Sequence, residues 1–359
     1  MTTPSTGRVT LAAAGDVCLG DHYVSLGHGT GSRVAAGENP FERLSLFHDA
    51  DIAVANLEAP LSRVSCCTDR VEAAVFRGPC EGAAVLDAGG IDVVNVANNH
   101  MMQHGDRAFH ETLELLDARG IATIGVAQGA RSRPVVRSLN GLTLGFLGFS
   151  FVPEAYAPGR QLYASPTLDE ALRDVAELAA RVDAVIVSVH WGVEFIPVPR
   201  QDVRGAAKAF VDAGATVVLG HHPHWFQPVE RIGRSLIAYS LGNLVFDLFW
   251  DTRCVESAVL RVDLTADGVA GHQLVPVRFD RDYRVRVRDD ASARRFLSML
   301  DRDARGLIAS SAEPSPNEHL ERMKKFAWFV TQMPRGDTTG KMRFIGSKAA
   351  RALRVRSPR

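Results

Sequence analysis

The chain has 359 residues, the length of one large domain or two ordinary ones, and 46% of them are hydrophobic. Lys and Arg equal Asp and Glu at 41 each, so the formal net charge is zero. A general binder of nucleic-acid phosphates carries a clear basic excess, which argues against that class of partner. The hydrophobic share and 23% charged residues also exclude intrinsic disorder.

Targeting signals and paired cysteines are missing from the sequence pattern. Residues 1–8 lack the positive region, the long apolar run and the cleavage site of a signal peptide. No apolar run approaches the roughly 20 residues of a membrane-spanning helix. The five cysteines are odd in number and show no CxxC spacing, which is typical of reduced thiols. We therefore expect a cytoplasmic protein with no membrane span.

The first third of the chain alternates short apolar runs with a helical pattern. Strands are predicted at residues 9–14, 51–55, 92–97 and 121–126, where Val, Ile and Ala are frequent. A helix is predicted at 106–119, because Phe109, Leu113 and Leu116 recur at helical spacing before Gly120.

A hairpin opens the middle of the chain. The runs 135–137 and 142–149 flank Asn140-Gly141, the dipeptide that a type I′ turn prefers. The elements predicted after it are a helix at 168–181, a strand at 184–189, a helix at 203–213 and strands at 216–219, 235–239, 255–264 and 273–279. Strand–helix alternation with a strand-rich close predicts an α/β sandwich with mixed sheets.

The composition changes near residue 280. We expect a catalytic domain over residues 1–280 and a C-terminal extension over 281–359, with a helix at 317–331. From 341 to 359 there are seven Lys or Arg and no acid. Such a tail is either a solvated terminus or a contact for an anionic partner.

Polar side chains follow five of the predicted strands at the point where each strand ends. Because ligands gather at the carboxyl ends of strands in open α/β sheets, these clusters converge if the strands are neighbours. Their carboxylate, amide and imidazole donors suit Mn²⁺, Fe²⁺, Zn²⁺ or Co²⁺. The clusters are Asp16, Asn56 with Glu58, Asn98 with Asn99 and His100, His190 with Trp191 and Glu194, and His221 with His222 and His224.

The segment from Gly220 to His224 is the most specific of these clusters. His222 and His224 stand two residues apart around Pro223, so a loop can aim both imidazoles at one point. Proline fixes its own φ and restrains the residue before it, which lowers the ordering cost of presenting ligands.

These motifs resemble the CapA-type poly-γ-glutamate capsule-synthesis family, in its order and spacing, over roughly residues 8 to 247. That family resembles the calcineurin-like metallophosphoesterases. The resemblance implies a four-layer sandwich of two mixed β-sheets flanked by helices, with two divalent metal ions at the strand ends. It rests on Gly15-Asp16-Val17-Cys18-Leu19-Gly20, Asn56-Leu57-Glu58, Ala97-Asn98-Asn99-His100, His190-Trp191-Gly192, Gly220-His221-His222-Pro223-His224 and Tyr239-Ser240-Leu241-Gly242-Asn243.

The resemblance also implies a role for each residue. One metal would be held by Glu58, Asn99, His190 and His222, and the other by Asp16, Glu58 and His224. Asp16, Asn99 and His100 would be the catalytic residues, with His100 as general acid. Two positions depart from the family pattern: Cys18 stands where a ligand His is usual, which leaves the second site one ligand short, and Gln103 stands where an Asp is frequent.

The implied chemistry is hydrolysis by a bridging hydroxide of a phosphoester or of a γ-glutamyl or other amide bond. The substrate would be a small molecule or a poly-γ-glutamate-like or peptide-like chain. Arg77, Glu194 and Trp191 are candidates for substrate binding, although a surface charge, a salt bridge and core packing explain them as well. Asn98, His221 and Asn243 are expected to support the ligands.

Two other functions fit parts of the sequence. Residues 238–242, Ala-Tyr-Ser-Leu-Gly, are one residue away from the nucleophile elbow of serine hydrolases, but no helical pattern follows Ser240. A non-catalytic component of capsule or polymer assembly that keeps the fold is the stronger alternative, because the second metal site is thin. Dinucleotide binding has no motif to support it.

Overall fold

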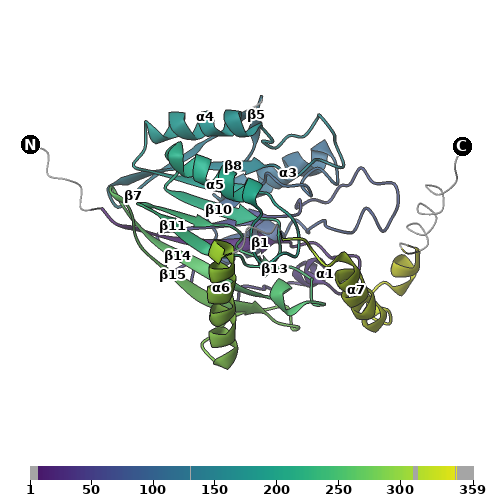
Figure 1. The fold of residues 1–359 in the computed structure, drawn as a ribbon. Helices are drawn as coiled ribbons and strands as arrows, with labels where there is room; N and C mark the ends of the chain where they lie inside the picture. The colour runs from purple at the N-terminus through teal and green to yellow at the C-terminus, as the bar shows by residue number, and fades with distance from the viewer. Residues whose placement is uncertain (1–6, 130, 310–313, 344, 346–359) are drawn as a thin grey trace, which may run out of the picture.

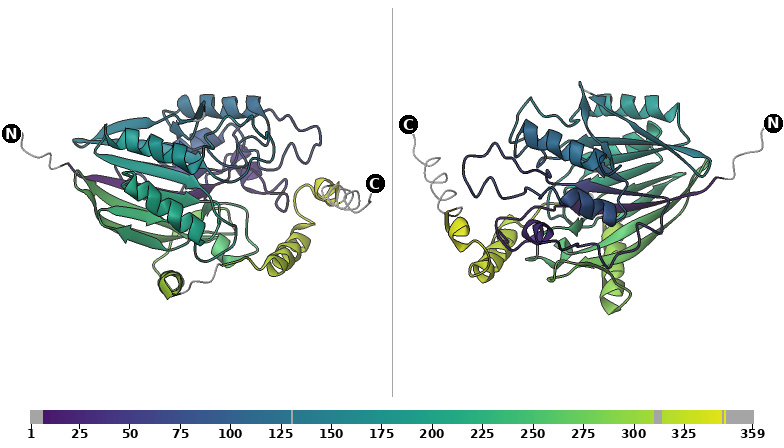
Figure 2. Two further views of the ribbon diagram at one scale, coloured as in Figure 1. Left: turned by 45° about the horizontal axis from the view of Figure 1, so that its top comes forward. Right: turned by 180° about the vertical axis from the view of Figure 1, so that it is seen from behind.

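Two mixed β-sheets face each other between layers of helices (Figure 1). The computed structural model describes residues 7–129, 131–309, 314–343 and 345. The four-layer sandwich confirms the fold expected from the sequence. Helix α7 (Glu318–Gln332) lies at the side of the molecule away from the N-terminus in all three ribbon views (Figures 1 and 2). No helix of the described residues combines the length and the apolarity that crossing a membrane requires.

The larger sheet has eight strands and is built around β1 (Val9–Val17). On one side β1 pairs in parallel with β2, which continues the parallel run to β3 and β4, and on the other side it pairs antiparallel with β14. The strand order is β16 (Val285–Val287), β15 (Gly268–Phe279), β14 (Glu256–Thr265), β1, β2 (Ile52–Leu57), β3 (Val93–Asn95) and β4 (Ala122–Ile124), and β13 (Asn243–Val245) pairs with the end of β1.

The smaller sheet has six strands, with a parallel centre and an antiparallel hairpin at each edge. Its order is β11 (Val229–Ile232), β12 (Ser235–Ala238), β10 (Val217–His221), β9 (Ala184–His190), β8 (Leu142–Ser150) and β7 (Val135–Leu139). A separate two-stranded sheet is formed by β5 (Ala127–Gln128) and β6 (Arg131–Ser132). The β7–β8 turn has φ of 48° at Asn140 and 82° at Gly141, the two positive values of a type I′ turn, so that prediction is confirmed.

Side chains that point alternately to the two faces of each strand form the hydrophobic cores between the layers. Leu11 and Ala13 of β1 pack into the core between the two sheets, whereas Ala12 and Ala14 face the outer helices. Helices α1 (Thr30–Ala35), α2 (Gly82–Ala88) and α3 (Asp106–Asp117) contribute to the outer core of the larger sheet, and α4 (Leu168–Ala179) and α5 (Gln201–Asp212) to that of the smaller one.

Several elements differ from their predictions. The sequence pattern did not predict α1, α2, β11 or α6 (Ala291–Ala309), and the 3₁₀ turn η1 (Thr252–Cys254) was also unexpected. β16 continues the larger sheet past residue 280, so the edge of the sheet does not coincide with the predicted domain boundary. The predicted C-terminal helix is present as α7 (Glu318–Gln332), where the Asn317 side chain accepts a hydrogen bond from the Leu320 amide at 3.1 Å.

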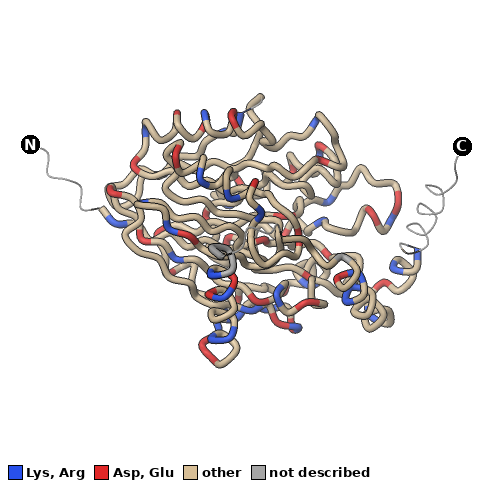
Figure 3. The backbone as a smooth tube through the Cα atoms, in the orientation of Figure 1, with Lys and Arg blue, Asp and Glu red and all other residues tan. Residues whose placement is uncertain are grey.

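The distribution of charged residues and the state of the cysteines agree with the balanced charge and the unpaired cysteines of the sequence. Acidic and basic residues are interspersed along the tube of the chain in Figure 3. All five cysteines are free. Most of the predicted basic tail, residues 344 and 346–359, lies outside the described residues.

The N-terminus of α1 has a cap from a distant part of the chain. The Asp247 carboxylate accepts hydrogen bonds from the Thr30 amide, at 3.0 Å, and from the Ser25 and Thr30 hydroxyls. Asp247 is only 2% exposed. Burial, with the nearby Asp21 charge, raises the pKa of Asp247 from its ordinary range to about 6, although these hydrogen bonds oppose the rise.

We expect Asp247→Asn to remove a pH dependence of stability. The folded wild-type chain keeps a proton on Asp247 between about pH 4 and pH 6 that the unfolded chain has released, so its stability falls as pH rises through that window. Relative to Asp247→Asn, the wild type should therefore lose up to about 3 kcal/mol of its free energy of unfolding between pH 4 and pH 7. Urea unfolding in chelator at both pH values measures it, and a constant difference would contradict it.

Candidate metal centre

Asp16 lies inside β1 rather than after it, because the strand runs on to Val17. Past a bulge, β1 places Asp16 beside Asn56 of β2 and Asn243 of β13. Gly15 makes this possible, since a Cβ there would lie 2.0 Å from the main-chain oxygen of Gly242. The Asp16 amide donates to the same oxygen at 2.9 Å, which fixes the carboxylate at the end of the larger sheet.

Asn56 joins the two carboxylates of the larger sheet. Its Nδ2 donates to Asp16 Oδ1 at 2.9 Å and lies 3.3 Å from Glu58 Oε2. All three side chains are fully buried. Asn56 belongs to a predicted motif in which it had no role of its own. The signal was its place two residues before Glu58, which favours the same face of an extended chain.

The smaller sheet contributes histidines from the ends of β9 and β10. His190 and His221 end these strands and stand directly opposite each other in the parallel register. His221 Nδ1 lies 3.1 Å from Asp16 Oδ1, and His190 Nε2 lies 2.8 Å from Asn99 Oδ1 and 4.0 Å from Glu58 Oε1. The ends of the two sheets therefore meet at one buried polar cluster.

The turn from His222 to His224 is strained rather than relaxed. The φ angles are 97° at His222 and 59° at His224, a region that residues other than glycine rarely adopt. This corrects the expectation that Pro223 lowers the cost of presenting the ligands, because proline disfavours such a conformation before it. Strain of this kind costs about 1–3 kcal/mol at each residue and persists where the surroundings impose it.

The strained turn sends its two imidazoles to different neighbours. His224 Nδ1 donates to Asn243 Oδ1 at 2.9 Å, and its Nε2 lies 4.0 Å from Glu58 Oε1. The His222 ring lies beside His190, with ring centroids 4.8 Å apart. Asn243 thus contacts His224 through its Oδ1, and its Nδ2 donates to the Cys254 carbonyl.

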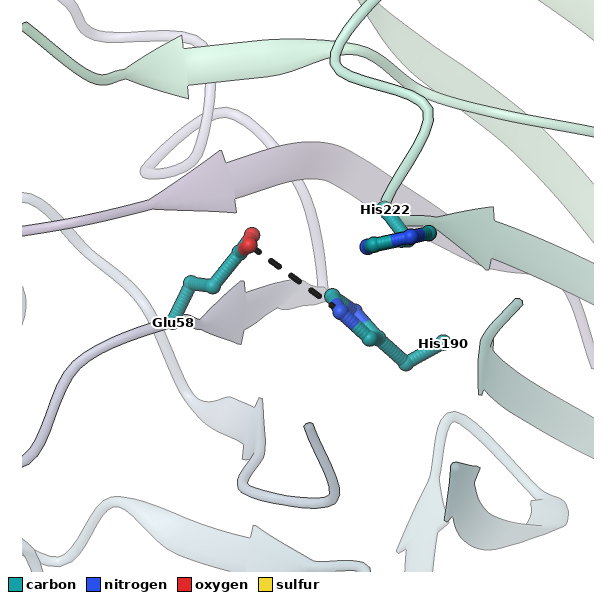
Figure 4. A group of neighbouring side chains, drawn as sticks. All are labelled: Glu58, His190 and His222. Atoms are coloured by element: carbon teal, nitrogen blue, oxygen red, sulfur yellow. Dashed lines mark ion pairs between the residues drawn. The ribbon is translucent and has the colours of Figure 1, made fainter. Parts of the chain in front are cut away.

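Two groups of metal-ligating side chains result, and they share Glu58. Glu58, His190 and His222 form one group, and their donor atoms lie within 4.8 Å of one another (Figure 4). Asp16, Glu58 and His224 form the other within the same limit. With Asn99 added beside His190, these are the sets that the family resemblance implied.

The buried polar atoms of this cluster fit divalent cations. Glu58 Oε1, His190 Nδ1 and His222 Nδ1 are buried and have no hydrogen-bond partner among the described residues. Burial, and then the Asp16 charge, raises the pKa of Glu58 well above its ordinary value. Burial also raises the pKa of Asp16, but the His221 hydrogen bond and neighbouring imidazoles outweigh it and lower that pKa. A cation would satisfy the unpartnered oxygen and neutralise two adjacent carboxylates.

His100 lies beside this cluster and is held from two sides. Its Nδ1 lies 3.1 Å from Gln103 Oε1, so Gln103 takes the orienting place in which an Asp is frequent in the family. Its amide donates to Asn98 Oδ1 at 3.2 Å, and Asn98 Nδ2 donates to the Leu57 carbonyl at 2.8 Å. Burial lowers the pKa of His100, although the Gln103 hydrogen bond opposes this.

The three candidates for substrate binding lie in different places. Glu194 lines a cavity together with His222. The Arg77 guanidinium donates to main-chain carbonyls of Ala73, Ser62 and Arg63 and lines another cavity. Trp191 is 2% exposed and donates to the Tyr239 carbonyl at 3.0 Å within the core of the smaller sheet. The structure thus brings only Glu194 of these three to the cluster.

Cys18 and Ser240 are buried in surroundings that suit neither a metal ligand nor a catalytic nucleophile. The Cys18 thiol packs with Phe246 and Leu248 in an apolar cluster, and burial raises its pKa well above the ordinary value. Within the described part of the chain it joins neither donor group. Ser240 is fully buried and is followed by β13, so the helix that a nucleophile elbow requires is not there.

Curated relatives come from capsule biosynthesis. The chain is 30% identical over 241 residues to "PGA biosynthesis protein CapA" of Bacillus subtilis, covering 65% of this chain and 62% of that one. It is 32% identical over 262 residues to "Capsule biosynthesis protein CapA" of Bacillus anthracis, covering 67% and 62%. The chain therefore spans about three fifths of the length of these relatives.

The chain also resembles a solved structure, and most of it matches a known protein family. The chain is similar to a phosphatase from Mycoplasma pneumoniae with a TM-score of 0.50 and 11% identity, over 81% of this chain and 99% of that one, which shows a shared fold. Residues 10–248 match the family described as bacterial capsule synthesis protein PGA_cap, and this range holds both donor groups and every motif quoted above. The chain therefore belongs to the bacterial capsule synthesis protein PGA_cap family.

Proposed function

We propose that this protein is a metal-dependent hydrolase whose Glu58 is shared between two divalent cations. One observation carries the proposal. Glu58 Oε1 is fully buried, lacks a hydrogen-bond partner among the described residues, and lies 4.0 Å from the Nε2 atoms of both His190 and His224. Burying such an oxygen without a partner is costly, and a pair of cations between these imidazoles would offset the cost.

Two overlapping sets of residues would hold the two cations. Glu58, Asn99, His190 and His222 would hold one cation, and Asp16, Glu58 and His224 the other. Bound there, divalent cations such as Mn²⁺, Fe²⁺, Zn²⁺ or Co²⁺ supply Lewis-acid charge and lower the pKa of water.

His100 is the proposed proton donor to the leaving group. The hydrogen bond from its Nδ1 to Gln103 leaves Nε2 for the transferred proton. Burial lowers the pKa of His100, which makes its imidazolium a stronger acid and also a less populated one at neutral pH.

The proposed substrate carries a phosphoester, or a γ-glutamyl or other amide bond. The "PGA biosynthesis" name of the Bacillus subtilis relative supports the glutamyl bond, and the fold shared with the Mycoplasma phosphatase is compatible with the phosphoester. Both reactions need the same parts: a nucleophilic water, positive charge at the oxygen that becomes negative, and an acid for the leaving group.

Metal content and turnover, measured on one preparation, test this function. The purified full chain is incubated with each of the four metals, desalted, and analysed by inductively coupled plasma mass spectrometry. We expect two equivalents of at least one metal, and hydrolysis of p-nitrophenyl phosphate, bis(p-nitrophenyl) phosphate or γ-glutamyl-p-nitroanilide that chelator stops. His222→Ala should lose one equivalent and the turnover, whereas His110→Ala, on the exposed face of α3, should lose neither.

The same experiment decides between the hydrolase and a non-catalytic alternative. A polymer-binding or assembly component has one observation in its favour, since the Cys18 thiol faces an apolar cluster where a further ligand is usual in the superfamily. A folded chain that binds no metal and turns over none of the three substrates would overturn the hydrolase and favour that alternative.

A further inference from the structure

Helix α7 lies outside the matched family range and yet reaches the metal centre. It spans Glu318–Gln332, whereas the family match ends at residue 248. Side chains of α7 close a cavity of about 430 Å³ beside His222. The cavity is lined by Gly192, Val193, Glu194, Phe195 and His222 on one side, Trp250 on another, and Pro316, Glu321, Arg322 and Lys325 from the C-terminal segment.

Lys325 is held at this cavity by two aromatic rings from distant parts of the chain. Its Nζ lies 4.7 Å from the ring centroid of Trp250 and 5.6 Å from that of Tyr23. Cation–π contacts of this length restrain an ammonium group without neutralising its charge. The position of Lys325 is therefore built into the packing of α7 against the rest of the protein.

A row of rings connects this anchor to the proposed proton donor. The ring of His22 lies 5.3 Å from that of Trp250 and 5.3 Å from that of Phe76, and Phe76 lies 4.5 Å from His100, all measured between centroids. On the opposite side of the cavity, Phe195 lies 5.6 Å from His224. Because His222 and Lys325 line the same cavity, a ligand there could contact a metal-ligating residue at one end and α7 at the other.

Two basic side chains of α7 line the cavity next to two acids. Arg322 and Lys325 stand three residues apart and so share a face of α7. Of the two acids in the lining, Glu321 has its Oε1 2.9 Å from the Lys324 Nζ, and Lys324 pairs with Asp251 as well. Glu194 is the other acid, and Arg322 and Lys325 are the basic side chains that an anion entering the cavity would meet.

We propose that α7 completes the substrate pocket of the metal centre and that Lys325, with Arg322, binds an anionic group of the substrate, a carboxylate or a phosphate. This inference rests on the proposed function for the reaction, but not for the binding of the anion. A carboxylate would belong to a glutamyl or peptide-like substrate, and a phosphate to a phosphorylated one. Because α7 comes from outside the matched range, it would set substrate choice on a shared catalytic core.

Calorimetric titration of the full chain loaded with Mn²⁺ tests the binding of the anion. The probes are glutarate, a dicarboxylate, and inorganic phosphate. We expect one of them to bind, and Lys325→Met to weaken it about tenfold or more, since a hydrogen bond to a charged group contributes that much. Methionine keeps the length and the apolar contact with Trp250, so it removes mainly the charge. Lys208→Met, at an exposed lysine of α5, should leave binding within twofold.

Conservative replacement separates charge from folding. Lys325→Arg keeps the positive charge over Trp250 and should retain most of the binding. Loss of binding in both Lys325→Arg and Lys325→Met, together with a changed near-ultraviolet circular dichroism spectrum, would indicate that α7 has detached from the rest of the protein. That result would contradict a role for the charge. No binding of either probe, or equal binding by wild type and Lys325→Met, would overturn the inference. Which probe binds decides between the carboxylate and the phosphate.

Turnover separates this inference from the proposed function. If a substrate from the screen is hydrolysed, Lys325→Met should raise its KM about tenfold with little change in kcat. An unchanged KM in an active Lys325→Met enzyme would contradict the role of α7 but not the proposed hydrolase function. Anion binding that depends on Lys325, in a protein with no turnover on any substrate, would keep the pocket and reject the hydrolase.

Discussion

Glu58→Gln should remove both cations at once while leaving the metal-free fold intact. The glutamine side chain has the shape of the protonated carboxyl that burial and Asp16 favour in the metal-free protein. The folded chain without metal should therefore tolerate the change. Metal binding should weaken by about 100-fold or more at both positions, because loss of a ligand costs at least what loss of a supporting partner does. Turnover should fall with it.

Single replacements in the two donor groups give the matched comparison. His222→Ala should remove the cation of its own group and spare the other, and His224→Ala the reverse, because only Glu58 belongs to both. Thermal unfolding with and without chelator adds a second measurement. Each bound cation stabilises the wild type by about 2.7 kcal/mol at 100 times its Kd, and Glu58→Gln should show no such difference. A variant that keeps one full equivalent would show that Glu58 is not shared.

Placement of the polar cluster could be predicted because it follows from strand order. Polar residues that end parallel strands meet at one edge of a sheet, and His190 and His221 do so in direct register. Asp16 reaches the same place from the other sheet, although it lies within its strand. The bounds of α3 and α4 could be predicted for a similar local reason, since one apolar face repeats at helical spacing.

Features that depend on distant residues left no local trace in the sequence. Asp247 caps a helix that begins 217 residues before it, and nothing near Thr30 indicates that partner. The strained φ at His222 runs against the preference that Pro223 imposes, and only the surrounding contacts can maintain it. The approach of α7 to the metal centre depends on rings as far apart as Tyr23 and Trp250. Such contacts are set by tertiary packing rather than by propensity.

Gly15→Ala should destabilise the protein by about 3 kcal/mol or more. The added Cβ would lie 2.0 Å from Gly242 O and 2.6 Å from Leu241 O, both main-chain atoms, so no side-chain rotation can relieve the clash. β13 would have to move away from β1, and the hydrogen bond from the Asp16 amide to Gly242 would be lost. Overpacking of a core and loss of a buried hydrogen bond together account for that magnitude.

Gly205→Ala is the matched control, with the opposite expected sign. Gly205 is exposed within α5, and a Cβ there meets nothing within 4 Å, so the alanine should stabilise the helix by about 0.5–1 kcal/mol. Urea unfolding in chelator measures both changes without a contribution from metal. With metal present, displacement of β13 also moves Asn243 away from His224, so Gly15→Ala should lose the cation of the Asp16, Glu58 and His224 group before that of the other. Equal stability of the two variants would show that β13 can shift without cost, and the close approach at Gly15 would then not be what fixes Asp16.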